Sequence, residues 1–172
     1  VITPHFHPSW SMWGGSKRKT LREFYDTVVG KGTMETADLI TCVSNHEKEM
    51  LISEIGISED NIKIIYNGIN WKDWEVLPDK SIFRNKYPEI SEKFVLFAGR
   101  LATNKGLSDL ISAMKEVNQE SVDLVIVGAD MGLGKDLVKE ASEKGVKMHK
   151  LGHIDDDTYR SVLASAEMLV LP

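Results

Sequence analysis

The chain has 172 residues and a formal net charge of −5, and 42% of its residues are hydrophobic. This share excludes an intrinsically disordered chain, and no apolar stretch approaches the roughly 20 residues that a membrane-spanning helix needs. The acidic balance argues against nucleic acid as the main partner. The single cysteine, Cys42, cannot form an intrachain disulfide and favours a cytoplasmic setting.

Both ends of the chain lie inside apolar runs. The chain opens with Val1-Ile2-Thr3-Pro4 and closes with an apolar run from Met168 to Pro172. We therefore expect it to be a piece of a longer protein.

The first 70 residues predict one α/β unit. Apolar residues at helical spacing, from Leu21 to Val29, predict a helix from Ser16 to about Val29 with one buried face. Buried strands are expected at residues 39–43 and 62–66. Between them, Ser44 and Glu47 form a capping box that starts a helix ending at Gly56. The polar, proline-containing stretch that follows predicts a linker with a short helix.

From residue 94 the pattern repeats. Continuous apolar runs at 94–98, 123–127, 146–151 and 168–171 are separated by segments with helical spacing. Such alternation predicts βαβ units and a parallel sheet covered on both faces, as in half to two-thirds of a doubly wound domain.

A candidate anion site follows the first of these strands. Gly99 would let the backbone approach an anion, and Arg100 and Lys105 add two cations just before a helix N-terminus. Ligands of open parallel sheets bind at this edge, so the pattern suits a diphosphate. The alternative is a solvated loop with ordinary surface charges.

Two further runs are weaker candidates. Residues 128–136 lack the first glycine and the Ser/Thr of a Walker A motif, so we interpret them as a glycine-rich turn that lines a cleft. Asp155-Asp156-Asp157 has the spacing of some metal-binding sugar transferases, but carboxylates before a helix more often cap it.

The N-terminal region contains two histidines and a basic aromatic segment. His5 and His7 could bind a metal or meet a substrate hydroxyl, although ordinary loop histidines are the commoner case. The Trp10–Arg22 region combines tryptophans with Lys17, Arg18 and Lys19, which suits peripheral contact with an anionic membrane. A helix packed on its own domain is the alternative.

Six segments in a fixed order resemble the group 1 glycosyltransferases, the retaining family 4 enzymes of GT-B fold. The resemblance covers nearly the whole chain, and its most specific part is Gly99-Arg100-Leu101 with Lys105-Gly106, in register with Asn67-Gly68-Ile69. The six segments are residues 37–44, 64–69, 97–106, 124–128, 151–154 and 166–172.

The resemblance implies an α/β fold of two partial Rossmann-like domains. Residues 1–70 would be the C-terminal part of the acceptor domain, 71–93 a linker, and 94–172 the first part of the nucleotide-sugar donor domain. Such enzymes transfer a sugar from a nucleotide-diphosphate sugar to an acceptor hydroxyl with retention of configuration. The resemblance implies a UDP- or GDP-sugar as substrate, a sugar, polysaccharide or glycolipid as acceptor, and no cofactor or metal.

The resemblance also implies residue roles. Arg100 and Lys105 would grip the donor diphosphate and offset its charge as it leaves, and Gly99 would let the donor approach. His5 would face the transferred sugar, with His7 the weaker match. The nucleoside pocket would be lined by Gly128, Gly152 and His153, and the interdomain hinge would begin at Asn67 and Gly68.

The chain departs from the family in what it contains. The family's donor-binding segment with a glutamate pair, which follows the strand ending in Leu-Pro, is not among the 172 residues, nor is its N-terminal glycine-rich loop. We therefore expect the chain alone to be inactive. Two alternatives are a non-catalytic nucleotide-sugar-binding module and another GT-B-like enzyme, such as a sugar-nucleotide epimerase.

Overall fold

The computed structural model describes residues 1–5, 20–21, 24–76, 78–117 and 122–172. The chain divides into two compact units, Val1–Trp71 and Lys72–Pro172. His7 and most of the Trp10–Arg22 region, which the sequence suggests for a metal or a membrane surface, lie outside the described residues. Within the described part, no helix is long and apolar enough to cross a membrane.

The first unit is built on two parallel strands, β1 (Ile40–Cys42) and β2 (Ile62–Ile64). Ile2 pairs with Ile40 on the other side of β1, which places the N-terminal residues beside the sheet. The predicted strands are thus present but shorter than expected. A short turn of helix, η4 (Glu59–Asn61), leads into β2.

The connection between the two strands begins at the predicted capping box. The Ser44 hydroxyl accepts a hydrogen bond from the Glu47 amide at 3.1 Å, and the Glu47 carboxylate accepts one from the Val43 amide at 2.8 Å. This satisfies two backbone N–H groups that have no partner inside the helix. Helix α3 (Asn45–Met50) then continues as η3 (Leu51–Ile55) to Gly56, as the sequence predicts.

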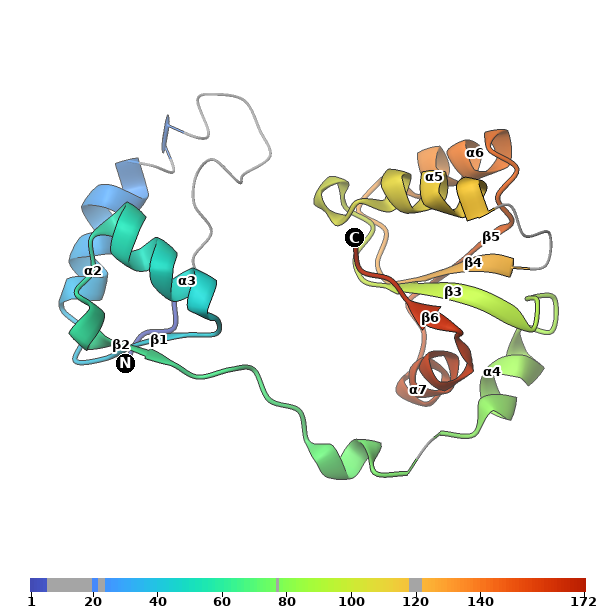
Figure 1. Ribbon diagram of the computed structural model, residues 1–172, viewed down its shortest axis with the longest axis horizontal. Helices are drawn as coiled ribbons and strands as arrows, with labels where there is room; N and C mark the ends of the chain where they lie inside the picture. Colours follow the sequence, from blue (N-terminus) through green and yellow to red (C-terminus); the bar gives the residue numbers. More distant parts are fainter. Residues whose placement is uncertain (6–19, 22–23, 77, 118–121) are drawn as a thin grey trace. The chain divides into compact units, whose positions relative to one another are not determined.

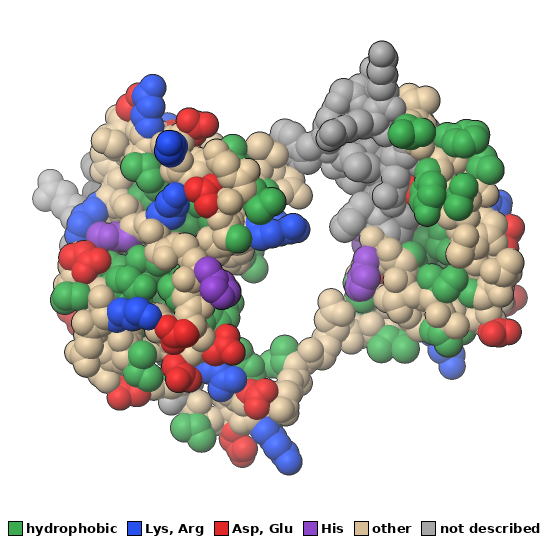
Figure 2. All heavy atoms as spheres, turned by 180° about the vertical axis from the view of Figure 1, so that it is seen from behind, with side chains coloured by type: hydrophobic (Ala, Val, Ile, Leu, Met, Phe, Trp, Pro, Cys, Tyr) green, Lys and Arg blue, Asp and Glu red, His purple; other side chains and the backbone are tan. Residues whose placement is uncertain are grey.

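The amphipathic helix differs from its prediction. It continues beyond Val29 through η2 (Asp26–Gly30) and α2 (Lys31–Glu35), so the predicted end is wrong by six residues. The predicted buried face is also wrong, since its described members are exposed, Phe24 by 62%. Figure 2 shows hydrophobic side chains gathered on this unit. Of η2 and α2, only Met34 joins the hydrophobic core. The apolar face of the helix therefore has no apolar surface covering it within the described residues.

The predicted linker is largely part of the second unit. After η5 (Trp71–Trp74), helix α4 (Lys80–Lys86) packs against α7 (Asp156–Ser165). Phe83 is fully buried, and its amide donates to the Ser161 hydroxyl at 2.9 Å. Residues 80–92 therefore pack as part of the second unit, although the sequence predicts a linker at residues 71–93, because Phe83 and Ile90 lie in the core of that unit.

The second unit contains four parallel strands in the order β5-β4-β3-β6. Figure 1 shows α5 (Leu107–Val117) and α6 (Gly134–Glu143) on one face of the sheet and α4 and α7 on the other. Each face has its own hydrophobic cluster. The prediction of an α/β fold with a parallel sheet covered on both faces is confirmed. The strands are β3 (Lys93–Ala98), β4 (Val122–Val127), β5 (Met148–Gly152) and β6 (Met168–Leu169).

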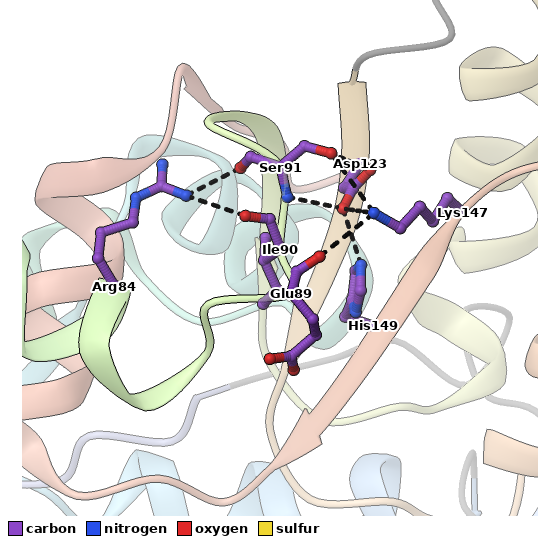
Figure 3. Close-up of polar contacts among 7 residues, drawn as sticks. All are labelled: Arg84, Glu89, Ile90, Ser91, Asp123, Lys147 and His149. Atoms are coloured by element: carbon purple, nitrogen blue, oxygen red, sulfur yellow. Dashed lines mark hydrogen bonds and ion pairs between the residues drawn. The ribbon is translucent and has the colours of Figure 1, made fainter.

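A buried carboxylate joins the amino ends of these strands (Figure 3). Asp123 in β4 is 1% exposed and accepts hydrogen bonds from the Ser91 amide and hydroxyl and from His149 Nε2, and it pairs with Lys147 at 2.9 Å. Burial alone raises the pKa of Asp123. The surrounding donors outweigh this effect and lower the pKa from 3.8 to about 2. The segment before β3 is thereby held to the sheet by a charged group.

The buried Asp123 carboxylate predicts a loss of stability in acid. Because its pKa is lower in the folded chain, it stabilises the fold above pH 3.8, and this stabilisation is lost as the pH falls through about 2. Between pH 5 and pH 2, the wild-type second unit should lose about 2 kcal/mol more unfolding free energy than Asp123→Asn. Urea unfolding followed through the amide resonances of β4 measures this difference. Asp136→Asn, at an exposed position of α6, serves as control and should keep the wild-type pH dependence. Equal losses in wild type and Asp123→Asn would contradict the assignment.

Candidate functional site

Three loops meet at the carboxyl edge of the second sheet. The Gly99 amide donates to Val127 at 2.8 Å, and the Gly128 amide donates to Gly152 at 2.8 Å. Because parallel strands end at the same edge, residues distant in the chain are brought together there. The structure thus places Gly99, Gly128 and Gly152 side by side, as the sequence suggests for a donor pocket.

The loops after β3 and β4 stay paired beyond the strands. The Leu101 amide donates to Ala129 at 2.9 Å, and the Met131 amide donates to Leu101 at 3.2 Å. Gly128 has a φ of +140°, and a Cβ atom there would lie only 2.0 Å from the Gly99 carbonyl oxygen. No side chain fits at Gly128 without moving the Gly99 loop, so this loop has a fixed backbone course.

Two cations lie beside this fixed backbone. Arg100 is exposed, and Lys105 is partly buried at the end of η6 (Thr103–Lys105), two residues before α5. Neither side chain forms an ion pair or hydrogen bond with another residue in the part of the chain that the structure describes. Lys86, Lys147 and Lys150 in the same unit all have acidic partners. Arg100 and Lys105 are therefore available to an anionic ligand.

The glycine-rich turn after β4 contains a pair of charges that the sequence analysis missed. Asp130 accepts hydrogen bonds from the Gly132 and Gly134 amides and from Lys150 Nζ. The Lys150 ammonium, followed by the two amides, lowers the pKa of Asp130 to about 2. The signal was present, because an aspartate two residues before a glycine is typical of a turn held by its own side chain.

The neighbouring acidic run caps a helix. Asp155 accepts a hydrogen bond from the Thr158 amide at 2.9 Å at the start of α7, and it pairs with Lys86 at 2.8 Å. The capping interpretation is confirmed for this residue. Across residues 1–5, 20–21, 24–76, 78–117 and 122–172, no three His, Cys, Asp or Glu side chains gather in a way that could hold a metal ion.

The remaining candidates follow strand ends. In the second unit, His153 is exposed and follows Gly152 directly. In the first unit, His5 follows the short segment paired with β1 and has a φ of +47°, an uncommon conformation for a residue other than glycine. Asn67 and Gly68 come after β2 and are exposed. His5 and Asn67 thus lie at the carboxyl edge of their own sheet, the edge where ligands of such sheets bind.

Family models match both units. A model described as "Glycosyl transferases group 1" matches residues 79–172, and one described as "Glycosyltransferase Family 4" matches residues 1–72. The chain belongs to the group 1 glycosyltransferases. This confirms the resemblance read from the six ordered segments.

Individual relatives of this glycosyltransferase chain agree with the family. It is 35% identical over 151 residues to an uncharacterized glycosyltransferase of Methanocaldococcus jannaschii, and the match covers 81% of this chain but 37% of the relative. Sucrose-phosphate synthase of Thermosynechococcus elongatus has a similar fold, with a TM-score of 0.75 at 22% identity over 99% of this chain and 43% of that chain.

HepE of Anabaena, solved in complex with UDP and glucose, has a TM-score of 0.66 at 19% identity. The match covers 92% of this chain and 42% of HepE. Likenesses at these identities establish the GT-B fold. The chain spans less than half the length of each of these three proteins.

Proposed function

We propose that the second unit binds the donor of a retaining glycosyltransferase, a nucleotide-diphosphate sugar. The observation that carries the proposal is the pair Arg100 and Lys105, two cations without acidic partners in the described part of the chain, beside the fixed Gly99 backbone. A diphosphate would supply the missing negative charge. The sugar would pass to a hydroxyl of a sugar, polysaccharide or glycolipid with its anomeric configuration retained.

The two cations suit the chemistry of the leaving group. Negative charge grows on the diphosphate as the bond to the sugar breaks, and fixed cations stabilise that charge without a metal or a cofactor. Gly99, Gly128, Gly152 and His153 would line the donor pocket. Asn67 and Gly68 would begin the hinge between the domains.

His5 is our candidate for contact with the transferred sugar. Its positive φ supports this role, because an uncommon backbone conformation at a strand end often accompanies a functional residue. As His5 belongs to the first unit, we expect His5→Ala to leave the binding of free UDP to the second unit unchanged.

Among nucleotides, we favour UDP over GDP. The support is the HepE structure with UDP and glucose, whose fold this chain shares.

Binding of UDP and GDP to the ¹⁵N-labelled 172-residue chain tests the donor site. UDP should shift the amide resonances of residues 99–106, and Arg100→Ala and Lys105→Ala should each weaken binding about 10-fold or more, since each removes a charge-assisted contact. Lys115→Ala, an exposed lysine at the far end of α5, is the matched control and should bind as wild type. Wild-type affinity in both Arg100→Ala and Lys105→Ala would contradict the proposal. So would the absence of any response of the chain to either nucleotide at millimolar concentration.

We further propose that the 172-residue chain alone transfers no sugar. The family's glutamate pair is not among its residues. Incubation with UDP-glucose and a sugar acceptor should release no UDP above the blank, and enzymatic UDP release would refute this. A chain that binds UDP without transfer would also fit the alternative of a non-catalytic binding module, which assays of a longer chain with the glutamate segment would distinguish.

Peripheral membrane contact through the Trp10–Arg22 region is a second proposal about partners. Its support is the set of exposed apolar side chains that follow this region, including Phe24 and Val28, together with the lysines and arginines that precede them in sequence. We expect the chain to sediment with phosphatidylglycerol vesicles and not with phosphatidylcholine. Phe24→Asp should reduce binding about 10-fold, since an aromatic side chain that the membrane would bury is lost. Val76→Asp, at an exposed apolar residue outside the helix, should have no effect. Equal binding to both vesicle types would refute the proposal.

A further inference from the structure

The glycine-rich turn after β4 is held by one side chain. Asp130 Oδ1 accepts a hydrogen bond from the Gly132 amide at 2.9 Å and another from the Gly134 amide at 3.0 Å. Both amides belong to the turn that leads into α6. Because a single oxygen joins the two glycines, the turn cannot open without breaking both hydrogen bonds.

Lys150 completes the arrangement from the neighbouring strand. Its Nζ donates to Asp130 Oδ2 at 2.9 Å, and both side chains are about one-third exposed. A Cβ atom at Gly134 would lie 2.0 Å from Asp130 Oδ2 and 2.3 Å from Lys150 Nζ. The pair therefore occupies the space that any side chain at Gly134 would need, which explains the glycine at the first residue of α6.

The pair also affects anion binding at this edge. The Asp130 carboxylate lies beside the N-terminus of α6 and accepts hydrogen bonds from the Gly132 and Gly134 amides, so these two donors are already used and a negative charge already lies there. Within the described residues, the Arg100 and Lys105 side chains form no ion pair or hydrogen bond, and neither does Lys135 in the first turn of α6. Asp130 also pairs through its backbone with Leu101, next to Arg100.

We propose that Asp130 and Lys150 are positioning residues for the nucleoside half of the donor. They hold the turn from Ala129 to Gly134 as a wall of the pocket, while the diphosphate binds at Arg100 and Lys105. This inference rests on the proposed donor-binding function. The two pairs then have different roles. Arg100 and Lys105 contact the phosphates, and Asp130 and Lys150 shape the surface that the ribose and base contact.

Paired measurements of UDP and inorganic pyrophosphate binding to the 172-residue chain test this division. Asp130→Ala should weaken UDP binding about 10-fold and change pyrophosphate binding less than about twofold, because only the nucleoside contacts the turn. Asp130→Asn should have a smaller effect, since its amide oxygen can still accept from both glycines. Lys105→Ala should weaken both ligands. Asp136→Asn, an exposed aspartate in the first turn of α6, is the matched control.

The turn can be observed directly in the same samples. The Gly132 and Gly134 amide resonances should move in Asp130→Ala and in Lys150→Met but stay in place in Asp136→Asn, and unchanged β3 and β4 resonances report that the unit remains folded. If the Ala variant does not fold, Asp130→Asn and Lys150→Met carry the test. Equal weakening of UDP and pyrophosphate, or no weakening of UDP, would overturn the positioning role. Failure of wild type to bind either ligand would instead overturn the proposed function.

Discussion

The approach of Gly128 to the Gly99 carbonyl fixes the geometry on which the site depends. A side chain at residue 128 would overlap that carbonyl, so the two loops pack backbone to backbone. They also remain hydrogen-bonded, from the Leu101 amide to Ala129, beyond the last residues of β3 and β4. Arg100 lies between these two points of attachment. Its backbone is thus held in place before any ligand arrives, which is the condition under which a cation stabilises developing charge most effectively.

The two ends of the same strands carry opposite electrostatic arrangements. At the amino end, the buried Asp123 receives hydrogen bonds from backbone, hydroxyl, imidazole and ammonium donors, so it anchors the fold and has no capacity left for a ligand. At the carboxyl edge, Asp130 is likewise saturated by Lys150 and the glycine amides, whereas Arg100 and Lys105 keep unpaired charge in the described part of the chain. The unit therefore keeps two cations for an anion beside the fixed Gly99 backbone.

The alternation of apolar runs was sufficient to predict the second unit, because buried parallel strands and amphipathic helices differ in both length and period. The same reasoning failed for the helix around Phe24. Its spacing correctly indicated a helix, but spacing does not say whether a partner surface exists, and the stripe is exposed. The interpretation of the segment around Phe83 differs from the structure in the opposite direction, because that segment is more buried than its composition suggested. Two prolines and many polar residues suggested a linker, although a few apolar side chains dock it firmly against α7.

By itself the sequence determined the α/β class, the order of the elements, the family and the position of the two cations Arg100 and Lys105. These follow from local periodicity and from motifs with fixed spacing. Only the tertiary structure decided which charges are already neutralised. Asp130 and Lys150 are 20 residues apart, and Ser91, Asp123 and His149 are spread over a wider stretch. Such pairs form because parallel strands bring distant residues to one edge of the sheet. The spacing of residues along the sequence does not show which of them meet in space.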